Sequence, residues 1–396
     1  MKKKRKKMLT VFLLAMMNVA IVLSLRGLPL MAKEGFSLVF YLLFALIIFL
    51  IPTALVSAEL ATAWEEEGGV FRWVTEAFGE KTGFTAIWLQ WSQNIFWYPT
   101  VLAFAAGALA YLFEMPELAE NPLYNIGVIL VIYWGSTFIN LRGMGAAGWL
   151  SSSGVLLGTI LPGVLIIVLG LIWWGMGKPL QFATSGNNFI PNFSNFSNLT
   201  LLAGIILLFA GMEVNAVHVK EVKNPRRSFP LAILLSVVII FGVFFLGSLA
   251  VAAVIPAEDI SLTAGIMQAF GQLLDGFGIR WLLPILGLFI AYGAVGGVAA
   301  WIVGPSKGMF ATSKLGLLPP VLSHANKRGV PSHILIVQGI VISIISLTYL
   351  VTPTVSSAFF LLTDLTVMLY LIMYLLLFAA AIRLRYKDPN RKRPYK

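Results

Sequence analysis

Two acidic residues stand inside stretches of sequence that are otherwise long and apolar. Glu213 ends the run Phe209-Ala210-Gly211-Met212-Glu213, and Asp364 lies within the segment 357–382. A carboxylate is costly in hydrocarbon unless it faces a partner or a wet cavity, so both residues are functional candidates. Because Gly211 weakens a helix beside Glu213, we predict a break there that offers backbone groups to a ligand. The alternative is a glycine-kinked packing helix with Glu213 bound to a neighbouring helix.

Further polar residues lie in the segments that must surround such a break. Segment 83–113 carries amide and aromatic side chains toward its middle: Trp88, Gln90, Trp91, Ser92, Gln93, Asn94, Trp97 and Tyr98. Lipid-facing aromatic residues belong at the membrane interfaces, so we expect this group either to line a cavity or to form hydrogen bonds between helices. Trp91 and Asn94 are the binding candidates. Asn18, followed by Val19 and Ala20, is a similar polar point in segment 8–31.

Other kinds of chemistry find little support in the residue types present. The sequence has no cysteine and only three histidines, so we expect no metal site and no cofactor. A membrane-embedded enzyme would need a nucleophile, a base or metal ligands that converge at one depth. A channel would need carbonyl loops or rings of charge. Neither pattern is evident.

The elements that position these residues are membrane helices. The chain has 396 residues, of which 59% are hydrophobic and 11% charged, and a soluble domain has no place for so much apolar surface. A helix of about 20 residues spans a bilayer. Ten segments fit that length: 8–31, 36–62, 83–113, 123–140, 146–176, 199–219, 230–254, 280–312, 333–351 and 357–382. The fold class is therefore an all-α polytopic membrane protein.

The distribution of positive charge predicts how these helices are oriented. If the N-terminus is inside, 24 of the 28 Lys and Arg residues fall on the inner side, and the outer side holds only Arg26, Lys33, Lys178 and Arg280. The positive-inside rule then predicts a multi-pass protein of the cell membrane with both termini cytoplasmic. The net charge of +11 is therefore explained by orientation in the lipid bilayer and not by binding to nucleic acid. The sequence does not indicate an oligomeric state.

Ten helices divide into two sets of five with opposite topology, which is what an inverted repeat requires. This division predicts five regions along the chain. They are a basic cytoplasmic N-terminus (1–7), a first repeat (8–176), an extracellular linker (177–198), a second repeat (199–382) and a basic cytoplasmic tail (383–396).

Several short stretches occur in the order and topology of a known family of transporters. They are Gly35-Phe36-Ser37-Leu38-Val39-Phe40, Ala58-Glu59-Leu60-Ala61-Thr62, Glu67-Gly68-Gly69-Val70-Phe71, Val219-Lys220-Glu221, Asn224-Pro225-Arg226, Ala300-Trp301-Ile302-Val303-Gly304-Pro305-Ser306-Lys307-Gly308-Met309 and Asn326-Lys327-Arg328-Gly329-Val330-Pro331. With them the chain resembles the amino acid–polyamine–organocation (APC) superfamily, and within it most of all the glutamate/GABA antiporters.

The resemblance implies a five-plus-five inverted repeat in which the first and sixth segments (8–31 and 199–219, called helix 1 and helix 6) are broken at the substrate site. It puts the helix 1 break at Asn18-Val19-Ala20 and the helix 6 break at Phe209 to Glu213. Free amides at the N-termini of half-helices suit a carboxylate, and free carbonyls at their C-terminal ends suit an ammonium. The chain departs from the family in two ways: its helix 1 break is not glycine-rich, and the last two of the usual twelve helices are absent.

We therefore expect a secondary amino acid transporter that works by alternating access, an antiporter of the glutamate/GABA type. The alternative is a proton-coupled symporter of amino acids or polyamines. Residues 291–300 offer no hydroxyl oxygen except that of Tyr292, which argues against Na⁺ coupling. The candidates for coupling or gating are Glu213, Asp364, Glu59 and Lys307. Replacement of Glu213 by Gln is expected to impair transport more than the same change at Glu59.

Overall fold

In the computed structural model, every secondary-structure element among the described residues is a helix; these residues are 10–64, 68–182, 189–191, 196–214 and 224–394. The predicted all-helical fold class is confirmed for this part of the chain. The basic N-terminus expected at 1–7 and parts of the linker expected at 177–198 lie outside the described residues, as does most of the basic turn after Glu213.

Within the described residues, eight helical spans are long and apolar enough to cross a bilayer. They are Gly35–Ala63 (α3 and α4), Glu80–Leu112 (α6), Pro122–Leu141 (α7), Gly148–Gly175 (α8 and α9), Arg227–Val254 (α11), Arg280–Lys314 (α13), Ser332–Val351 (α14 and α15) and Val355–Lys387 (α16). Each coincides within a few residues with one of the ten expected segments. The two expected segments without such a helix, 8–31 and 199–219, are those predicted to be interrupted. They hold the short helices α1 (Val11–Val22), α2 (Gly27–Ala32) and α10 (Phe196–Leu208).

Two of the long spans widen in their middle, each just before a proline. A π-helical turn over Leu46–Leu50 joins α3 (Leu38–Ala45) to α4 (Ile51–Ala63), and Pro52 follows it. A second such turn over Leu156–Ile160 joins α8 (Met144–Val155) to α9 (Leu161–Gly175), and Pro162 follows that one. A proline ring clashes with the carbonyl four residues earlier in a regular helix. A π turn moves that carbonyl away and lets the span continue.

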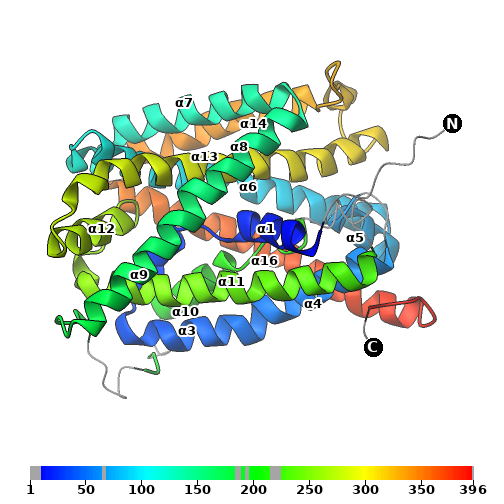
Figure 1. Cartoon of the computed structure of the whole chain (residues 1–396). Coiled ribbons are helices and arrows are strands. Elements are labelled where there is room, and N and C mark those ends of the chain that lie inside the picture. Colours follow the sequence, from blue (N-terminus) through cyan, green and yellow to red (C-terminus); the bar gives the residue numbers. More distant parts are fainter. Residues whose placement is uncertain (1–9, 65–67, 183–188, 192–195, 215–223, 395–396) are drawn as a thin grey trace.

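The centre of the bundle is α6, the most buried of the eight spans. It packs along α13 (Leu283–Lys314) and α16 (Val355–Lys387), while α1 lies against α11 (Pro225–Val254), as Figure 1 shows. Two helices run beside the bundle without qualifying as spans. They are α5 (Val70–Phe78), which packs on α6 and α16, and α12 (Gly265–Gly276), which packs on α11 and α13. The polar residues of α6 are therefore held where three long helices meet.

The small residues of segment 146–176 allow an unusually close approach between that span and α13. A Cβ atom on Gly158 would lie 2.0 Å from the carbonyl oxygen of Phe289, and one on Gly293 would lie 2.5 Å from the backbone of Gly158. Only glycine fits at such distances. Ser153 on the same span reaches across to Tyr292, with 2.6 Å between the two hydroxyl oxygens.

Contacts between loops and helix ends fall into two sets, one at each end of the bundle. At one end, Lys387, the last residue of α16, contacts Glu76 of α5, and Asn326 donates to the carbonyl of Leu141. At the other end, Lys178 donates to the carbonyl of Gly276 at 3.1 Å. Every one of these contacts joins segments that the charge distribution puts on the same side of the membrane.

Candidate functional site

The first interruption lies a few residues later in the chain than predicted. Asn18, Val19 and Ala20 are helical, because α1 continues to Val22, and the chain is non-helical over residues 23–26 before α2 begins at Gly27. The prediction of a break at Asn18-Val19-Ala20 is therefore wrong. Pro29 gives the physical reason. In a continuous helix its ring would clash with the carbonyl of Leu25, whereas in the first turn of a new helix it is tolerated.

The second interruption lies where it was predicted. Helix α10 ends at Leu208, and residues 209–213 are non-helical. Gly211 has a φ of +118°, which side chains other than glycine rarely adopt. Its amide donates a hydrogen bond of 2.7 Å to the hydroxyl of Tyr374 in α16. The break is thus held by a specific partner on another helix.

Glu213 is buried and accepts hydrogen bonds from two helices. Its Oε1 accepts from Nε2 of Gln90 at 2.9 Å and from the hydroxyl of Tyr370 at 2.5 Å, and its Oε2 accepts from the hydroxyl of Tyr374 at 2.6 Å. Because Tyr374 also receives the amide of Gly211, one hydroxyl links the carboxylate to the broken backbone. The expectation that Glu213 is bound to neighbouring helices and the expectation of a helix break both hold.

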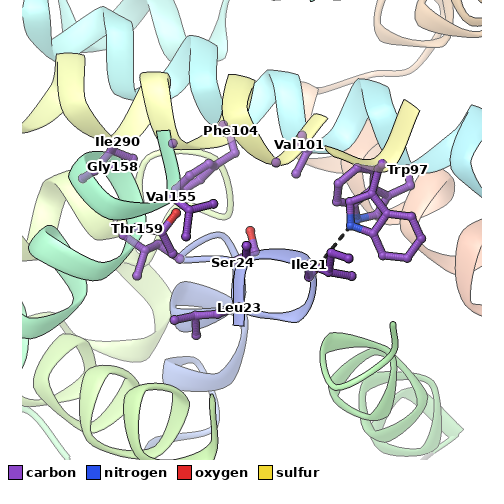
Figure 2. A pocket seen from close by; sticks show the side chains of 16 residues that line it. Ile21, Leu23, Ser24, Trp97, Val101, Phe104, Val155, Gly158, Thr159 and Ile290 are labelled. Carbon is purple, nitrogen blue, oxygen red and sulfur yellow. Dashed lines mark hydrogen bonds between the residues drawn. The ribbon is translucent and has the colours of Figure 1, made fainter. Parts of the chain in front are cut away.

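The two interruptions adjoin each other in space. A Cβ atom on Gly211 would lie 3.0 Å from Cγ2 of Ile21 and 3.1 Å from Cζ2 of Trp301. Trp301, in α13, donates its Nε1 hydrogen to the carbonyl of Ile21 at 3.1 Å. Figure 2 shows this bond, with Ser24 and Leu23 on the loop that follows Ile21. One indole side chain therefore contacts both interrupted segments.

Two small cavities lie beside this junction. The first has a volume of about 30 Å³ and is lined by residues that include Ala20, Ser24, Trp97, Gly158 and Trp301. The second, with about 40 Å³, is lined by residues that include Ser24, Arg26, Asn94, Ala210 and Tyr370. Ligand pockets usually have some 300–1,000 Å³. An amino acid can therefore enter only if side chains or the interrupted segments move.

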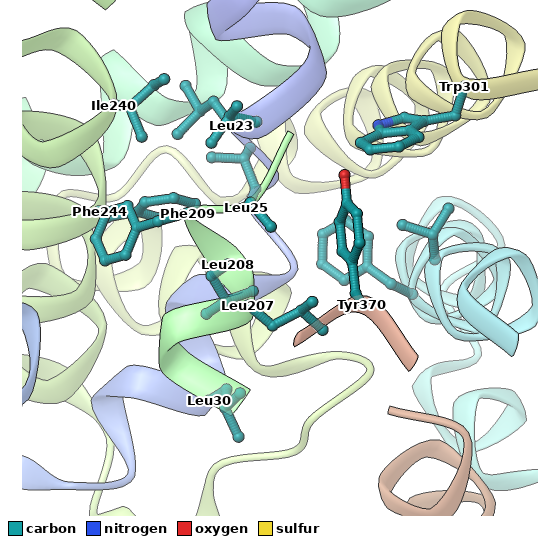
Figure 3. Packing of buried hydrophobic residues seen from close by; sticks show 14 of the residues in the cluster. Leu23, Leu25, Leu30, Leu207, Leu208, Phe209, Ile240, Phe244, Trp301 and Tyr370 are labelled. Atoms are coloured by element: carbon teal, nitrogen blue, oxygen red, sulfur yellow. The ribbon is translucent and has the colours of Figure 1, made fainter. Parts of the chain in front are cut away.

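Aromatic side chains line the two cavities: Trp97 and Trp301 line both, and Tyr370 lines the second. The rings of Trp97 and Trp301 lie 5.5 Å apart, and Tyr370 meets Trp301 edge-on at 6.3 Å. Figure 3 shows the hydroxyl end of Tyr370 directed toward Trp301, while Phe209 packs away from them against Phe244. Trp301 and Tyr370 were not among the predicted site residues. An aromatic residue after the glycine- and alanine-rich stretch of segment 280–312 was the signal available for Trp301.

Some of the predicted binding residues line one of the two cavities, and others do not. Those that line a cavity are Ala20, Asn94 and Ala210. Buried beside the junction without lining a cavity are Asn18, Val19 and Phe209. Trp91 packs on Trp88 with 5.5 Å between ring centres and lines neither cavity. Asp364 is half-buried in α16 and also lines neither cavity. In α6, both expected roles occur, because Gln90 forms an interhelical hydrogen bond while Gln93, Asn94 and Trp97 line a cavity.

The other two coupling or gating candidates lie away from the junction. Glu59, at the end of α4, is buried and forms ion pairs with Arg385 at 2.5 Å and Arg393 at 2.9 Å. Lys307 is exposed and lines a separate cavity of about 130 Å³ together with Arg328. Within the described residues, His, Asp and Glu side chains form no group of three or more that could hold a metal ion.

Arg26 has a location that the sequence did not predict. We expected it on the outer side, at the end of segment 8–31, but it is 5% exposed and belongs to the first interruption. One terminal nitrogen donates to the hydroxyl of Thr100 at 2.9 Å, and the guanidinium carbon lies 5.5 Å from the centre of the Phe359 ring. Nothing in its flanking residues distinguishes it from a loop arginine, since the signal depends on where the helix breaks.

Comparison with known proteins gives consistent results along the whole chain. The family model described as amino acid permease matches residues 7–396. An uncharacterized transporter of Legionella pneumophila is 42% identical over 390 residues, which are 98% of this chain and 84% of that protein. A glutamate/gamma-aminobutyrate antiporter of Lactococcus lactis is 36% identical over 384 residues, 96% of this chain and 76% of that protein. The structure of MhsT in complex with L-phenylalanine is similar in fold, with a TM-score of 0.65, 15% identity and coverage of 96% of this chain and 95% of that one.

Proposed function

The chain belongs to the amino acid permease family, and on that basis we propose that it is a secondary active amino acid transporter that exchanges substrates of the glutamate/GABA type by alternating access. It is a multi-pass membrane transporter and not an enzyme. The exchange of glutamate for GABA rests on the name of the Lactococcus relative and on the family motifs in this sequence.

The observation that carries this proposal is the meeting of two interrupted helical segments at one buried point. Interrupted helices leave backbone amides and carbonyls without helical partners, and a zwitterion can use both. The amides of Ser24, Leu25 and Arg26 donate no hydrogen bond to any other residue that the structure describes. These donors lie next to the cavity that Ser24 and Arg26 line.

We infer the following architecture from the same evidence. There are ten spans in two five-helix repeats of opposite topology, 8–176 and 199–382, joined by an extracellular linker at 177–198. The interrupted spans are the first, made of α1 and α2, and the sixth, which begins with α10. Support comes from the fold similarity to MhsT and from the contacts of Lys178, Asn326 and Lys387, each of which joins segments that the charge distribution puts on the same side. Both termini, 1–7 and 383–396, are proposed to be cytoplasmic.

We propose that two buried acidic residues couple substrate binding to alternating access, one near the interruptions and one at the inner end of the bundle. Glu213 is the first candidate because it links α6 and α16 to the helix break through Gln90, Tyr370 and Tyr374. Glu59 is proposed as an inner gate, since its ion pairs with Arg385 and Arg393 tie α4 to the end of α16 and the tail. Opening of the inner side would have to break them.

Asp364 and Lys307 remain weaker candidates because neither contacts the junction. A proton-coupled symporter of amino acids or polyamines is the alternative, and in it Glu213 would take up and release the proton.

Counterflow in proteoliposomes tests the proposed function. Vesicles that contain the purified protein are loaded with unlabelled glutamate or GABA and then diluted into labelled glutamate. We expect labelled glutamate to accumulate only in vesicles that contain unlabelled substrate. Accumulation that follows a pH gradient in vesicles without internal substrate would favour the symporter, and conductance without saturation would contradict a carrier.

A further inference from the structure

Arg26 is a buried positive charge for which the described part of the chain supplies no negative partner. Its side chain is 5% exposed, and no carboxylate of a described residue lies within ion-pair distance of it. Some more exposed arginines do have acidic partners: Arg280 pairs with Asp275, and Arg385 with Glu59. An arginine stays protonated in proteins, and burial of a charge without a counter-charge is costly. A site with this property calls for an anion.

The contacts of Arg26 leave most of its hydrogen-bond donors available. A guanidinium has five N–H donors in a planar fork. One nitrogen bonds to Thr100, whose own hydroxyl hydrogen is used by the carbonyl of Trp97 at 2.8 Å. Thr100 therefore acts as an acceptor and fixes the side chain of Arg26. The Nε atom is buried and has no hydrogen-bond partner among the described residues.

Arg26 also lies where a ligand would be. It lines the same cavity as Asn94, Trp97, Trp301 and Tyr370, so its unused donors are beside the junction of the two interrupted segments. Its other close neighbour is the ring of Phe359, which attracts a cation but cannot neutralise it. The geometry of a guanidinium fork matches a carboxylate, to which it donates two parallel hydrogen bonds.

We propose that Arg26 binds a carboxylate of the substrate, and that its positive charge makes the cavity select acidic and zwitterionic amino acids against polyamines and cationic amino acids. This inference rests on the proposed function. It deepens that function by naming the side chain that sets the substrate class. The carboxylate is either the α-carboxylate or one at the far end of the substrate, as in glutamate.

The test compares the wild type with Arg26→Gln and Arg26→Lys in proteoliposomes, using counterflow of glutamate, glutamine, GABA and lysine. Glutamine has the shape of glutamate without the second negative charge. In the wild type we expect glutamate and GABA to be taken up and lysine to be excluded. In Arg26→Gln the apparent KM for glutamate should rise about 30-fold, which corresponds to about 2 kcal/mol, the value of a hydrogen bond to a charged group. Arg26→Lys, which keeps the charge, should recover part of this loss.

The pattern across substrates identifies the carboxylate. A rise in KM for glutamate with an unchanged KM for glutamine assigns Arg26 to the far carboxylate, and an equal rise for both assigns it to the α-carboxylate. Arg280→Gln, which removes an exposed arginine near one end of the bundle, serves as the matched control and should leave every KM unchanged.

Two results would overturn the inference while leaving the transporter assignment intact. The first is that Arg26→Gln has the same KM values for glutamate and glutamine as the wild type. The other is a loss of maximal rate, with unchanged KM values and a lower unfolding temperature, in both Arg26 variants, because that pattern belongs to a structural arginine. If the wild type exchanges no amino acid at all, the proposed function itself fails.

Discussion

The hydroxyl of Tyr374 is the most informative single group to remove, since it serves both the helix break and the buried carboxylate. It accepts from the amide of Gly211 at 2.7 Å and donates to Glu213 at 2.6 Å, and the residue is 1% exposed. Tyr374→Phe keeps the ring and creates no cavity. It leaves a buried N–H and one carboxylate oxygen without partners, and each such group costs about 1–3 kcal/mol. The expected loss of stability is therefore about 2–6 kcal/mol.

Tyr370→Phe is the matched comparison. Its hydroxyl donates only to Oε1 of Glu213, and Gln90 still donates to that oxygen after the change. The expected loss is about 1 kcal/mol, close to the net value of one hydrogen bond. Each variant lacks one hydroxyl, and both residues lie on the same helix. The difference between them therefore reports the unpaired amide of Gly211 together with the unpaired Oε2 of Glu213.

Thermal unfolding in detergent, followed by tryptophan fluorescence, ranks the variants. We expect the unfolding temperature to fall in the order wild type, Tyr370→Phe, Tyr374→Phe. Tyr386→Phe, at a residue that is 84% exposed, should match the wild type. Equal unfolding temperatures for the Tyr370 and Tyr374 variants would refute the reasoning that the Tyr374 hydroxyl holds the interrupted backbone.

Two further predictions follow from packing and from buried charge. Gly158→Ala puts a Cβ 2.0 Å from the carbonyl of Phe289 and should abolish folded, monodisperse protein in size-exclusion chromatography, whereas Gly127→Ala, which meets no atom within 4 Å, should leave it unchanged; equal yields would contradict the close packing of the two spans. Glu213→Gln should reduce counterflow more than Glu59→Gln does. Glu59→Gln should lower stability by about 1–3 kcal/mol, because Glu59 is buried and Arg393 largely so, while Arg385 is partly exposed to solvent. A Glu213 variant with wild-type counterflow would remove Glu213 from the mechanism.

Most of the architecture could be predicted from local properties of the sequence. Apolar length located every span, because the bilayer selects for it directly. The break after α10 was also predictable, since Gly211 and Glu213 are both unfavourable in a continuous apolar helix. The break after α1 was predicted too early in the chain, because the prediction relied on the polar residue Asn18. The break lies instead just before α2, where Pro29 is tolerated in the first turn.

The site itself depended on contacts between distant segments, which no local pattern records. Trp301, Tyr370 and Tyr374 acquire their roles only because α13 and α16 pack beside the interruptions. Asp364 shows the opposite case, because an acidic residue at membrane depth was a reasonable candidate but lines neither cavity. Arg26 was counted with the outer charges because its burial follows from the position of the break.

The central claim is that an amino acid binds at the junction of the two interrupted segments, and a single introduced cysteine tests it directly. The natural chain has no cysteine, so Ser24→Cys, which lines both cavities, would carry the only thiol. We predict that glutamate or GABA slows labelling of this thiol by a small methanethiosulfonate reagent, while labelling of Ser357→Cys at an exposed position does not change. Labelling of Ser24→Cys at the same rate with and without saturating substrate that the same preparation transports would contradict the claim.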